Sequence, residues 1–417
     1  MQSLPGFRDF LPADCAVRNY IFAQWRQVAR RYGFVEYDGP LLEDLELFKK
    51  KSGEEITKQL YDFVDKGGRA VALRPEMTPT LARMVAAAQR DFRKPMKWFC
   101  MPQMFRYERP QRGRLREHYQ FNADIIGEAS PDADTELIAL CIDVLRAFGF
   151  TADDVVVRIS DREFWIDFLR TQNVPEERWL QVLETIDKSE REPREKSAER
   201  LGDLAAPVFD IFDRGGKSEK LDNIVAGLQQ RGLGDYAAVD LRIVRGLAYY
   251  TGVVFEAFDR GGKLRAIAGG GRYDNLVSHL SDGAASLPAL GFAMGDVVLG
   301  ELIKEKASAR AQMEAATARE QQLDFYVVVA KEERRADALA SVQALRDFGY
   351  RVDYPITAAK VGKQFQSAEQ LSARVALLFG DEWPHVKVKT LATREEQLVP
   401  HEDLLAHLAA FPSLSPR

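Results

Sequence analysis

Residues 105–121 read FRYERPQRGRLREHYQF, a stretch that predicts two strands joined by an arginine-rich loop. The flanking segments 97–107 and 118–127 have the apolar and aromatic content of strands, and the loop RPQRGRLRE holds proline and glycine. The sequence therefore predicts a long hairpin. Several arginines on its loop indicate a functional tip, because loops held by a rigid scaffold often carry binding residues.

The hairpin ends the most basic part of the chain. Between Arg90 and Arg116, nine lysines and arginines stand against only two acidic residues. The arginines alternate with aromatic residues and glycine, a pattern that suits a phosphate-binding loop better than a solvated helix face. The net charge of −5 indicates no nucleic-acid partner by itself, but a local basic patch is sufficient for phosphate binding.

Outward from the hairpin, the pattern predicts an antiparallel sheet flanked by helices. Apolar residues recur at three- and four-residue spacing over 14–32, which predicts a helix ended by Gly33, and a short strand follows up to Pro40. Residues 161–235 are charged and helical, and we interpret them as an inserted helical subdomain. Further elements are expected as strands at 69–73, 155–160, 239–244 and 251–258, helices at 78–90 and 135–148, and a strand, glycine bend and helix over 287–305.

The C-terminal part has a different pattern. Residues 306–321 have no apolar stripe wide enough for a core and are the best candidate for a linker. From residue 322 to 417, strand and helix signals alternate, as in FYVVVA followed by ADALASVQALRDFGY. This alternation predicts a small α/β domain of about 95 residues.

Five segments of the predicted sheet are unusually rich in charge and glycine. Charged residues on strands that face a core cost several kcal/mol unless they are partnered, so such a sheet should bind something charged. The triplet Gly269–Gly271 would let a ligand approach the backbone closely. The segments are LRPEMTPTLAR (73–83), FRYERPQRGRLRE (105–117), YQFNADIIG (119–127), VRGLAYYTG (244–252) and AGGGRYD (268–274).

Composition excludes several classes of protein. Cys15, Cys100 and Cys141 are odd in number and widely spaced, which argues against a disulfide framework or a CxxC metal site, and the five histidines form no ligand cluster. No run of about 20 apolar residues is present, and the N-terminus lacks the pattern of a secretory signal. We therefore expect a cytoplasmic protein without a membrane span and without a metal held by a protein cluster.

FRYERPQRGRLREHYQF resembles the second signature motif of class II aminoacyl-tRNA synthetases. The segments VRGLAYYTGVVFE, AGGGRYD and LRPEMT resemble the amino-acid-site signatures of the histidyl-tRNA synthetase family, and the resemblance covers essentially the whole chain. It implies an α+β fold, with a class II antiparallel sheet in a catalytic domain at 1–305 that contains the helical insertion. It also implies a linker at 306–321 and an α/β anticodon-binding domain at 322–417.

The resemblance implies two reactions: histidine attacks the α-phosphate of ATP, and the terminal ribose of tRNA then attacks the histidyl-adenylate. Both build negative charge, so catalysis should depend on positioning and fixed cations, including Mg²⁺. Arg106 and Arg245 are implied as catalytic residues beside the α-phosphate and the reacting carboxylate. Residues implied for ATP are Arg106, Glu108 for the adenine amino group, Arg114 for the terminal phosphates, and Arg272.

Histidine itself brings an ammonium and an imidazole. Glu76, Thr78 and Gln120 are placed for the ammonium, and Asp124 and Tyr250 for the ring nitrogens. The implied histidine site also includes Arg245, Tyr249 and Tyr273, and Gln111 and Arg112 are candidates for the acceptor end of tRNA.

The chain departs from the family pattern in two places. Leu115 stands where many members carry an aromatic residue. In GFAMGDVVLGEL (291–302), members of the family carry an acidic residue followed by arginine where this chain has Val297 and Val298. An arginine that usually contacts ATP is therefore absent.

Two alternatives to the synthetase remain from sequence. One is the regulatory subunit of ATP phosphoribosyltransferase, a paralogue without the anticodon domain, and the other is a full-length paralogue that no longer catalyses aminoacylation. The helix at 14–32 and the strand ending at Pro40 match the first class II motif, so a twofold homodimer is expected.

Overall fold

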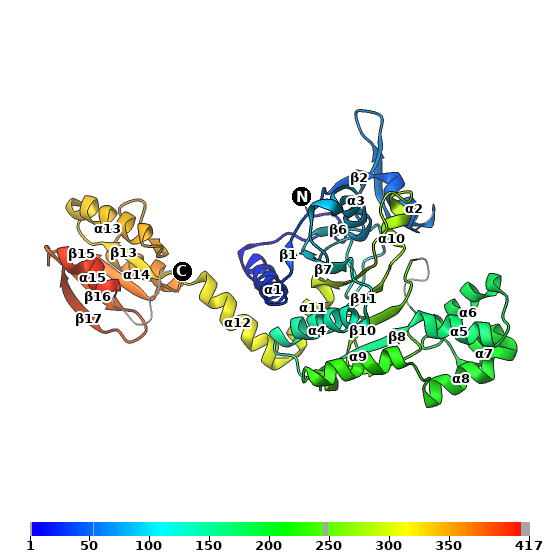
Figure 1. Ribbon diagram of the computed structural model, residues 1–417. Helices are drawn as coiled ribbons and strands as arrows, with labels where there is room; N and C mark the ends of the chain where they lie inside the picture. Colours follow the sequence, from blue (N-terminus) through cyan, green and yellow to red (C-terminus); the bar gives the residue numbers. More distant parts are fainter. Residues whose placement is uncertain (1, 53, 245–248, 410–417) are drawn as a thin grey trace. The chain divides into compact units, whose positions relative to one another are not determined.

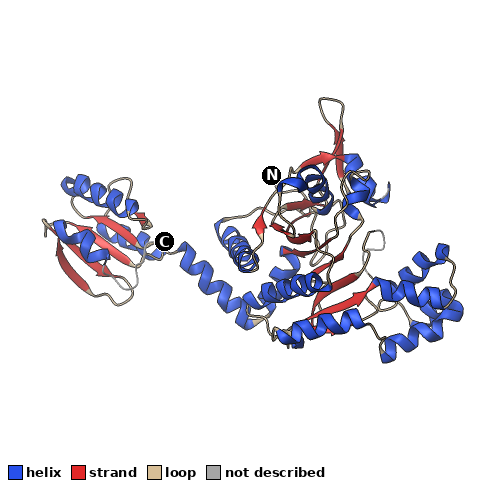
Figure 2. Cartoon of the chain, in the orientation of Figure 1, coloured by secondary structure: helices blue, strands red, loops and turns tan. Residues whose placement is uncertain are grey.

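The computed structural model describes residues 2–52, 54–244 and 249–409 (Figure 1). The chain divides into two compact units, residues 1–313 and 314–417, and each is described by itself. The predicted α+β fold is confirmed: the first unit has a large, mainly antiparallel sheet with helices, and the second is a small α/β unit (Figure 2).

The first unit is built on a nine-stranded sheet of order β1-β5-β7-β12-β11-β10-β8-β9, with β6 paired to β7. All pairs are antiparallel except β1–β5 and β8–β9, at the two ends. The strands are β1 (Val35–Glu36), β5 (Met96–Cys100), β6 (Gln103–Phe105), β7 (Glu117–Ile126), β8 (Val155–Asp161), β9 (Ala237–Val239), β10 (Val253–Asp259), β11 (Ala268–Arg272) and β12 (Ala289–Gly295).

Two long helices, α1 (Pro12–Arg31) and α4 (Pro131–Ala147), cover one face of this sheet. Trp25 of α1 is fully buried and stacks on Phe121 of β7 at 5.7 Å between ring centroids. Phe121 in turn meets the edge of Phe292 on β12 at 5.7 Å. The aromatic residues that alternate along β7 and β12 therefore fix one face of the sheet in the core, which leaves the opposite face for a site.

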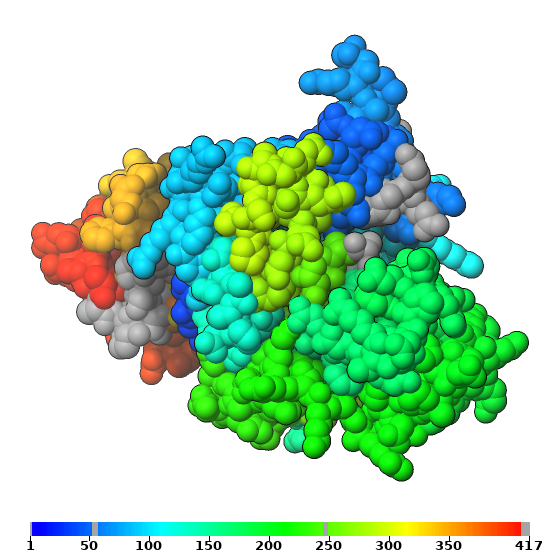
Figure 3. All heavy atoms as spheres, turned by 45° about the vertical axis from the view of Figure 1, so that its right-hand side comes forward, coloured from blue at the N-terminus to red at the C-terminus, as the bar shows by residue number. Residues whose placement is uncertain are grey.

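A second, three-stranded sheet of order β2-β4-β3 belongs to the same unit. Its strands are β2 (Leu42–Asp44), β3 (Tyr61–Val64) and β4 (Ala70–Leu73), and the turn between β3 and β4 projects from the surface (Figures 1 and 3). Three helices that contact one another lie beside it: α2 (Leu45–Ser52), α3 (Thr78–Ala88) and α10 (Leu276–Leu280).

The helical character predicted for 161–235 is confirmed. It forms α5 (Arg162–Thr171), α6 (Glu176–Lys188), α7 (Arg194–Leu201), α8 (Ala205–Arg214) and α9 (Glu219–Gln230), seen as a green lobe in Figure 3. Lys220 of α9 bonds to Asp161 at the end of β8 at 3.2 Å and also to Glu163. Trp165 is fully buried and donates its indole N–H to the Leu241 carbonyl at 2.8 Å. These contacts attach the helices to the edge of the sheet.

The second unit has a five-stranded sheet of order β14-β13-β15-β16-β17. One apolar core joins the sheet to α13 and α15, and another joins its other face to α14. The elements are β13 (Phe325–Val329), α13 (Arg335–Asp347), β14 (Val352–Asp353), α14 (Val361–Gln370), β15 (Val375–Phe379), β16 (His385–Thr390), β17 (Glu396–Pro400) and α15 (Leu404–Ala409).

Three sequence-based expectations differ from the structure. The expected strand at 239–244 ends at Val239, because the Asp240 carboxylate accepts the backbone N–H of Arg242 at 3.1 Å and turns the chain. The strand expected over 97–107 is broken between β5 and β6, where the Pro102 carbonyl accepts the Gln120 N–H at 3.1 Å. The linker candidate forms a helix, α12 (Ala307–Gln321), with only Ala309 and Met313 buried among its described residues.

Candidate active site

A cavity of about 650 Å³ opens on the sheet face opposite Trp25. Its walls come from the connection between β4 and α3, from the β6–β7 hairpin, from β7, and from the segment just after β11. Among the residues predicted from sequence, the lining contains Glu76, Thr78, Arg106, Glu108, Arg114, Gln120, Asp124, Tyr249, Tyr250 and Tyr273.

The cavity exists because two central strands carry almost no side chains on this face. Gly291, Ala293 and Gly295 of β12 pair directly with Asp124, Asn122 and Gln120 of β7, so these six residues share one face. On β11, Gly269 and Gly271 pair with Ala293 and Gly291 and continue the same face. The small residues form a floor from which the polar side chains of β7 rise beside open space.

Asp124 is the most deeply placed acid of the cavity. It is 5% exposed, and the Tyr273 hydroxyl donates a hydrogen bond to its carboxylate. Burial raises the pKa of Asp124 to about 7, although the Tyr273 hydrogen bond and the charge of Lys51 act in the opposite direction. Gly291 makes room for this carboxylate, since a Cβ there would lie 1.9 Å from the Asp124 Oδ1 atom.

The raised pKa of Asp124 predicts that the free energy of unfolding depends on pH. Because the folded pKa lies above the usual 3.8, the folded state keeps this proton longer than the unfolded chain, and its stabilising effect disappears as the pH rises through about 7. Between about pH 5 and about pH 8 this loss amounts to about 2–3 kcal/mol.

The measurement compares the wild-type chain with Asp124→Asn by urea unfolding at both pH values. The difference in free energy of unfolding should shift in favour of the variant at the higher pH, because asparagine does not titrate. A difference that stays constant between the two pH values would contradict the raised pKa.

Aromatic rings and one lysine complete the Asp124 end. Tyr249 lies 4.3 Å from Tyr250 and 6.3 Å from Tyr273 between ring centroids. The Lys51 ammonium lies 4.0 Å above the Tyr249 ring and bonds to Glu76 at 2.5 Å. Lys51 is a residue that sequence reasoning missed, because its helix reads as an ordinary charged surface. The contact demonstrates that Glu76 can bind a primary ammonium in this place.

Arginines gather at the hairpin end of the cavity. Arg106 donates its Nε–H to the Pro75 carbonyl at 2.9 Å, and Arg114 bonds to Glu108 at 2.7 Å. Arg116 lies 4.3 Å above the Tyr107 ring and donates to the Glu108 carbonyl at 3.1 Å. The hairpin is therefore held by cation–π and hydrogen-bond contacts, and it directs Arg106 and Arg114 into the cavity.

His118 also lines the cavity, between these arginines. Burial, together with the charges of Arg106, Arg8 and Arg114, lowers the pKa of His118 to about 3. Its imidazole is therefore neutral near pH 7, and it adds no cation to the site.

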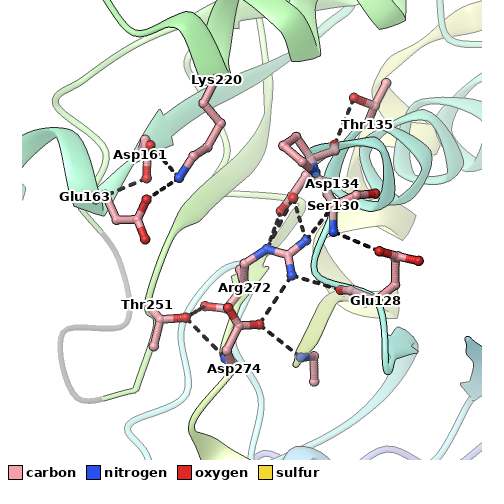
Figure 4. A network of polar contacts seen from close by, with 12 residues as sticks. Glu128, Ser130, Asp134, Thr135, Asp161, Glu163, Lys220, Thr251, Arg272 and Asp274 are labelled. Atoms are coloured by element: carbon pink, nitrogen blue, oxygen red, sulfur yellow. Dashed lines mark hydrogen bonds and ion pairs between the residues drawn. The ribbon is translucent and has the colours of Figure 1, made fainter. Parts of the chain in front are cut away.

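Arg272 takes a different place from the one expected for an ATP-binding residue. It lies on the face of β11 opposite the cavity floor and bonds to Asp134 of α4 at 2.6 Å, with both side chains buried (Figure 4). The carbonyls of Glu128 and Ser130 accept further bonds at 3.0 and 3.2 Å. The assignment of Arg272 to ATP is therefore corrected: its guanidinium attaches β11 to the start of α4.

The same network also holds Thr251, which lies just before β10. The Asp274 backbone N–H donates to the Thr251 hydroxyl at 3.1 Å, and the Asp274 carboxylate accepts the Ala289 N–H at 3.1 Å (Figure 4). Thr251 is thereby joined to the end of β11 and the start of β12. Removing Arg272 would strand Asp134 in the core, a loss worth about 3–5 kcal/mol.

Arg245, predicted as a catalytic residue, falls among residues 245–248, outside the described part of the chain. Two further predicted residues, Gln111 and Arg112, lie outside the cavity lining. Gln111 and Arg112 lie at the hairpin turn, where the Gln111 N–H donates to the Arg114 carbonyl at 3.0 Å. Arg112 forms ion pairs with Glu301 and Glu305 of α11 (Asp296–Glu305) on the surface.

Val297 and Val298 do line the cavity, so the absent arginine leaves an apolar patch beside the hairpin. The preceding residue, Asp296, serves the fold: its carboxylate accepts from Arg8 at 2.8 Å and from the Tyr119 N–H at 2.9 Å. Arg191 and Arg265 line the cavity as well and were missed from sequence, where single arginines in loops carry no signal.

Among residues 2–52, 54–244 and 249–409, no group of three or more His, Cys, Asp or Glu side chains is placed to hold a metal ion. No helix of the described chain is long and apolar enough to cross a membrane.

Comparison with known proteins identifies the family of the chain. The histidyl-tRNA synthetase family matches residues 6–208 and 195–296, and an anticodon-binding domain matches 324–410. The histidine–tRNA ligase of Opitutus terrae is 46% identical over 98% of both chains. The chloroplastic/mitochondrial histidine–tRNA ligase of Arabidopsis thaliana is 39% identical over 96% of this chain and 85% of its own length.

A solved structure of histidyl-tRNA synthetase from Nostoc sp. PCC 7120 has the same fold, with a TM-score of 0.79 over 98% of both chains at 24% identity. Because both parts of the chain are matched and full-length relatives exceed 30% identity, the chain belongs to the histidyl-tRNA synthetase family.

Proposed function

We propose that the chain is a histidine–tRNA ligase, which activates histidine with ATP to histidyl-adenylate and transfers it to the 3′ end of tRNA. The observation that carries the proposal is the Asp124–Tyr273 pair, buried at one end of a cavity whose other end carries arginines. An imidazole suits the first end because both ring nitrogens can be hydrogen-bonded there. A nucleotide suits the second end because its phosphates need cations.

The histidine subsite follows from the groups at the Asp124 end. Asp124 and Tyr250 bind the ring nitrogens, and the rings of Tyr249 and Tyr273 enclose the imidazole. The ammonium is bound by Glu76, with Thr78 and Gln120 as neutral acceptors, and it shares Glu76 with Lys51 or displaces it. A pocket that bonds both sides of an imidazole rejects apolar side chains, which would leave Asp124 without the hydrogen bond from the ligand.

The nucleotide subsite occupies the hairpin end. Arg106 binds the α-phosphate beside the reacting carboxylate, with Arg245 as its partner in catalysis. Glu108 accepts from the adenine amino group, and Arg114 reaches the terminal phosphates once its ion pair with Glu108 opens. Mg²⁺ held by the phosphates of ATP would neutralise further charge, without a protein cluster of its own.

The remaining assignments concern tRNA and assembly. Residues 322–417 bind the anticodon region, residues 1–305 carry catalysis, and Gln111 and Arg112 contact the acceptor end. The matched anticodon-binding domain disfavours the regulatory-subunit alternative, which lacks one. Exposed Leu11 and Val35, in the α1–β1 region that matches the first class II motif, support a twofold homodimer, and a cytoplasmic location remains a prediction.

ATP–pyrophosphate exchange with each of the twenty amino acids tests the function. Histidine should support exchange at low concentration, and every other amino acid should be at least about 10³-fold poorer in kcat/KM, because the buried Asp124 would lose its hydrogen bond to the ligand. Equal exchange with glutamine or phenylalanine would contradict the histidine subsite. A folded chain with no exchange activity would favour the non-catalytic paralogue.

A further inference from the structure

Arg265 is a cavity arginine that none of the roles above uses. It lies in the connection between β10 and β11, and that connection is fixed at both ends. The Asp259 carboxylate accepts the backbone N–H groups of Lys263 and Leu264, each at 3.1 Å. On the other side, the Ile267 N–H donates to the Ala257 carbonyl at 2.8 Å. The backbone that carries Arg265 is therefore held in place.

Arg265 and Val298 meet at the same point of the hairpin. A Cβ on Gly113 would lie 3.3 Å from the Val298 Cγ2 atom and 3.9 Å from the Arg265 Cδ atom. The valine comes from α11, and the arginine comes from the β10–β11 connection. The side chain of Arg265 thus lies beside the position where the family motif expects an arginine and this chain has valine.

The charges at this end of the cavity are not balanced. Among the described residues, the Arg265 side chain has no hydrogen-bond or ion-pair partner, and the Arg106 side chain donates only to the Pro75 carbonyl. Glu108 is the only carboxylate that the described lining places at the hairpin end, and Arg114 already pairs with it. Burial, followed by repulsion from Arg265 and Arg106, lowers the pKa of Arg114. Guanidinium groups that converge on one cavity favour the binding of a multiply charged anion, which would relieve their mutual repulsion.

We propose that Arg265 binds the terminal phosphates of ATP, and the same groups of pyrophosphate, in place of the arginine that Val298 replaces. The inference rests on the proposed function, because the anion is taken to be the nucleotide of the activation reaction. Among the described residues, Arg265 pairs with no carboxylate, whereas Arg114 must leave Glu108 before it can bind another anion. Arg265 can therefore bind phosphates without breaking an ion pair.

The test uses the chain with Arg265→Met, which keeps an unbranched stem similar to that of arginine and removes the charged guanidinium group. In ATP–pyrophosphate exchange, the KM values for ATP and for pyrophosphate should each rise by about tenfold to hundredfold, and the KM for histidine should stay within about twofold. Lys263→Met is the matched control: it removes a nearby exposed cation from the same connection, outside the cavity lining.

Rescue distinguishes phosphate binding from a general effect of charge. Val298→Arg added to Arg265→Met should recover at least about tenfold of the lost kcat/KM for ATP, because it returns a guanidinium to the same point. Unchanged KM values for ATP and pyrophosphate in Arg265→Met, or an equal loss in Lys263→Met, would overturn the proposal.

Calorimetric binding separates this proposal from the function on which it rests. Arg265→Met should weaken the binding of ATP by about tenfold or more and leave the binding of AMP nearly unchanged, because AMP lacks the terminal phosphates. If the substitution weakens AMP binding as much as ATP binding, Arg265 does not contact the terminal phosphates. A different outcome is that the substitution weakens ATP binding but not AMP binding while the wild-type chain shows no histidine-dependent exchange. In that case the proposed ligase function is wrong and the proposed phosphate site is supported.

Discussion

Gly291→Ala should lower kcat/KM for histidine by about 10²–10³-fold, with little change in the KM for ATP. The added Cβ would lie 1.9 Å from the Asp124 Oδ1 atom and 2.7 Å from its Cγ atom, well inside contact distance. Asp124 must therefore rotate or shift, and its hydrogen bond with the Tyr273 hydroxyl breaks. A catalytic pocket tolerates such displacement poorly, because reacting groups must be held within a fraction of an ångström.

Gly300→Ala is the matched control for this substitution. Gly300 lies in α11 outside the cavity lining, and a Cβ there would meet nothing within 4 Å. It should keep full activity and gain up to about 1 kcal/mol of stability, because alanine favours a helix. Thermal melting must show that both variants are folded. Wild-type histidine kinetics in a folded Gly291→Ala chain would remove Asp124 from the histidine subsite.

Ending the chain after Gln321 should keep pyrophosphate exchange within about threefold and lower tRNA charging by about 10³-fold. The first unit keeps its own sheet and core, including Trp25, Phe121 and Phe292, so we expect adenylate formation to need nothing from the second unit. The second unit has separate cores on both faces of its sheet. If residues 322–417 bind the anticodon region as proposed, losing them removes one of two surfaces that bind the same tRNA, and the effective concentration of the acceptor end at the active site falls.

Two measurements make this prediction decisive. Steady-state charging should show the loss in the KM for tRNA more than in kcat, and saturating tRNA should restore part of the rate. A folded fragment without exchange activity would show that the catalytic unit does not end before residue 322. Undiminished charging would show that 322–417 does not serve tRNA.

The resemblance to the family predicted most of the residues that line the cavity, and the period of two along a strand explains part of that outcome. Gln120 and Asp124 are four positions apart, so both side chains lie on one face of β7, and the cavity contains both. Arg272 shows the limit of the pattern. It stands directly before Tyr273, and adjacent residues of an extended chain point to opposite faces, so one enters the cavity and the other reaches α4. Which of them enters depends on register with β12, which a single sequence does not state.

The residues missed from sequence are those whose role depends on distant elements. Lys51 meets Glu76 only because α2 packs beside α3, and Arg265 meets Gly113 only across the sheet. The helix α12 was missed for a different reason. Residues 306–321 lack a broad apolar stripe, yet alanine and other strong helix formers dominate them, so intrinsic propensity is sufficient for a helix.

The pairing of β7 with β12 also governs when the protein can become active during its synthesis. Asp124 leaves the ribosome long before Gly291, its partner in the register. At 5–20 residues per second, the delay is on the order of 10 s. Before β12 is synthesised, β5 and β6 are the only two of the neighbours of β7 in the described sheet that are available to it, and the strand that supplies the pocket floor is missing. The proposed histidine subsite is therefore incomplete in a nascent chain that lacks β12. Premature termination before residue 295 should leave an edge of β7 unpaired, and such an edge favours aggregation and degradation.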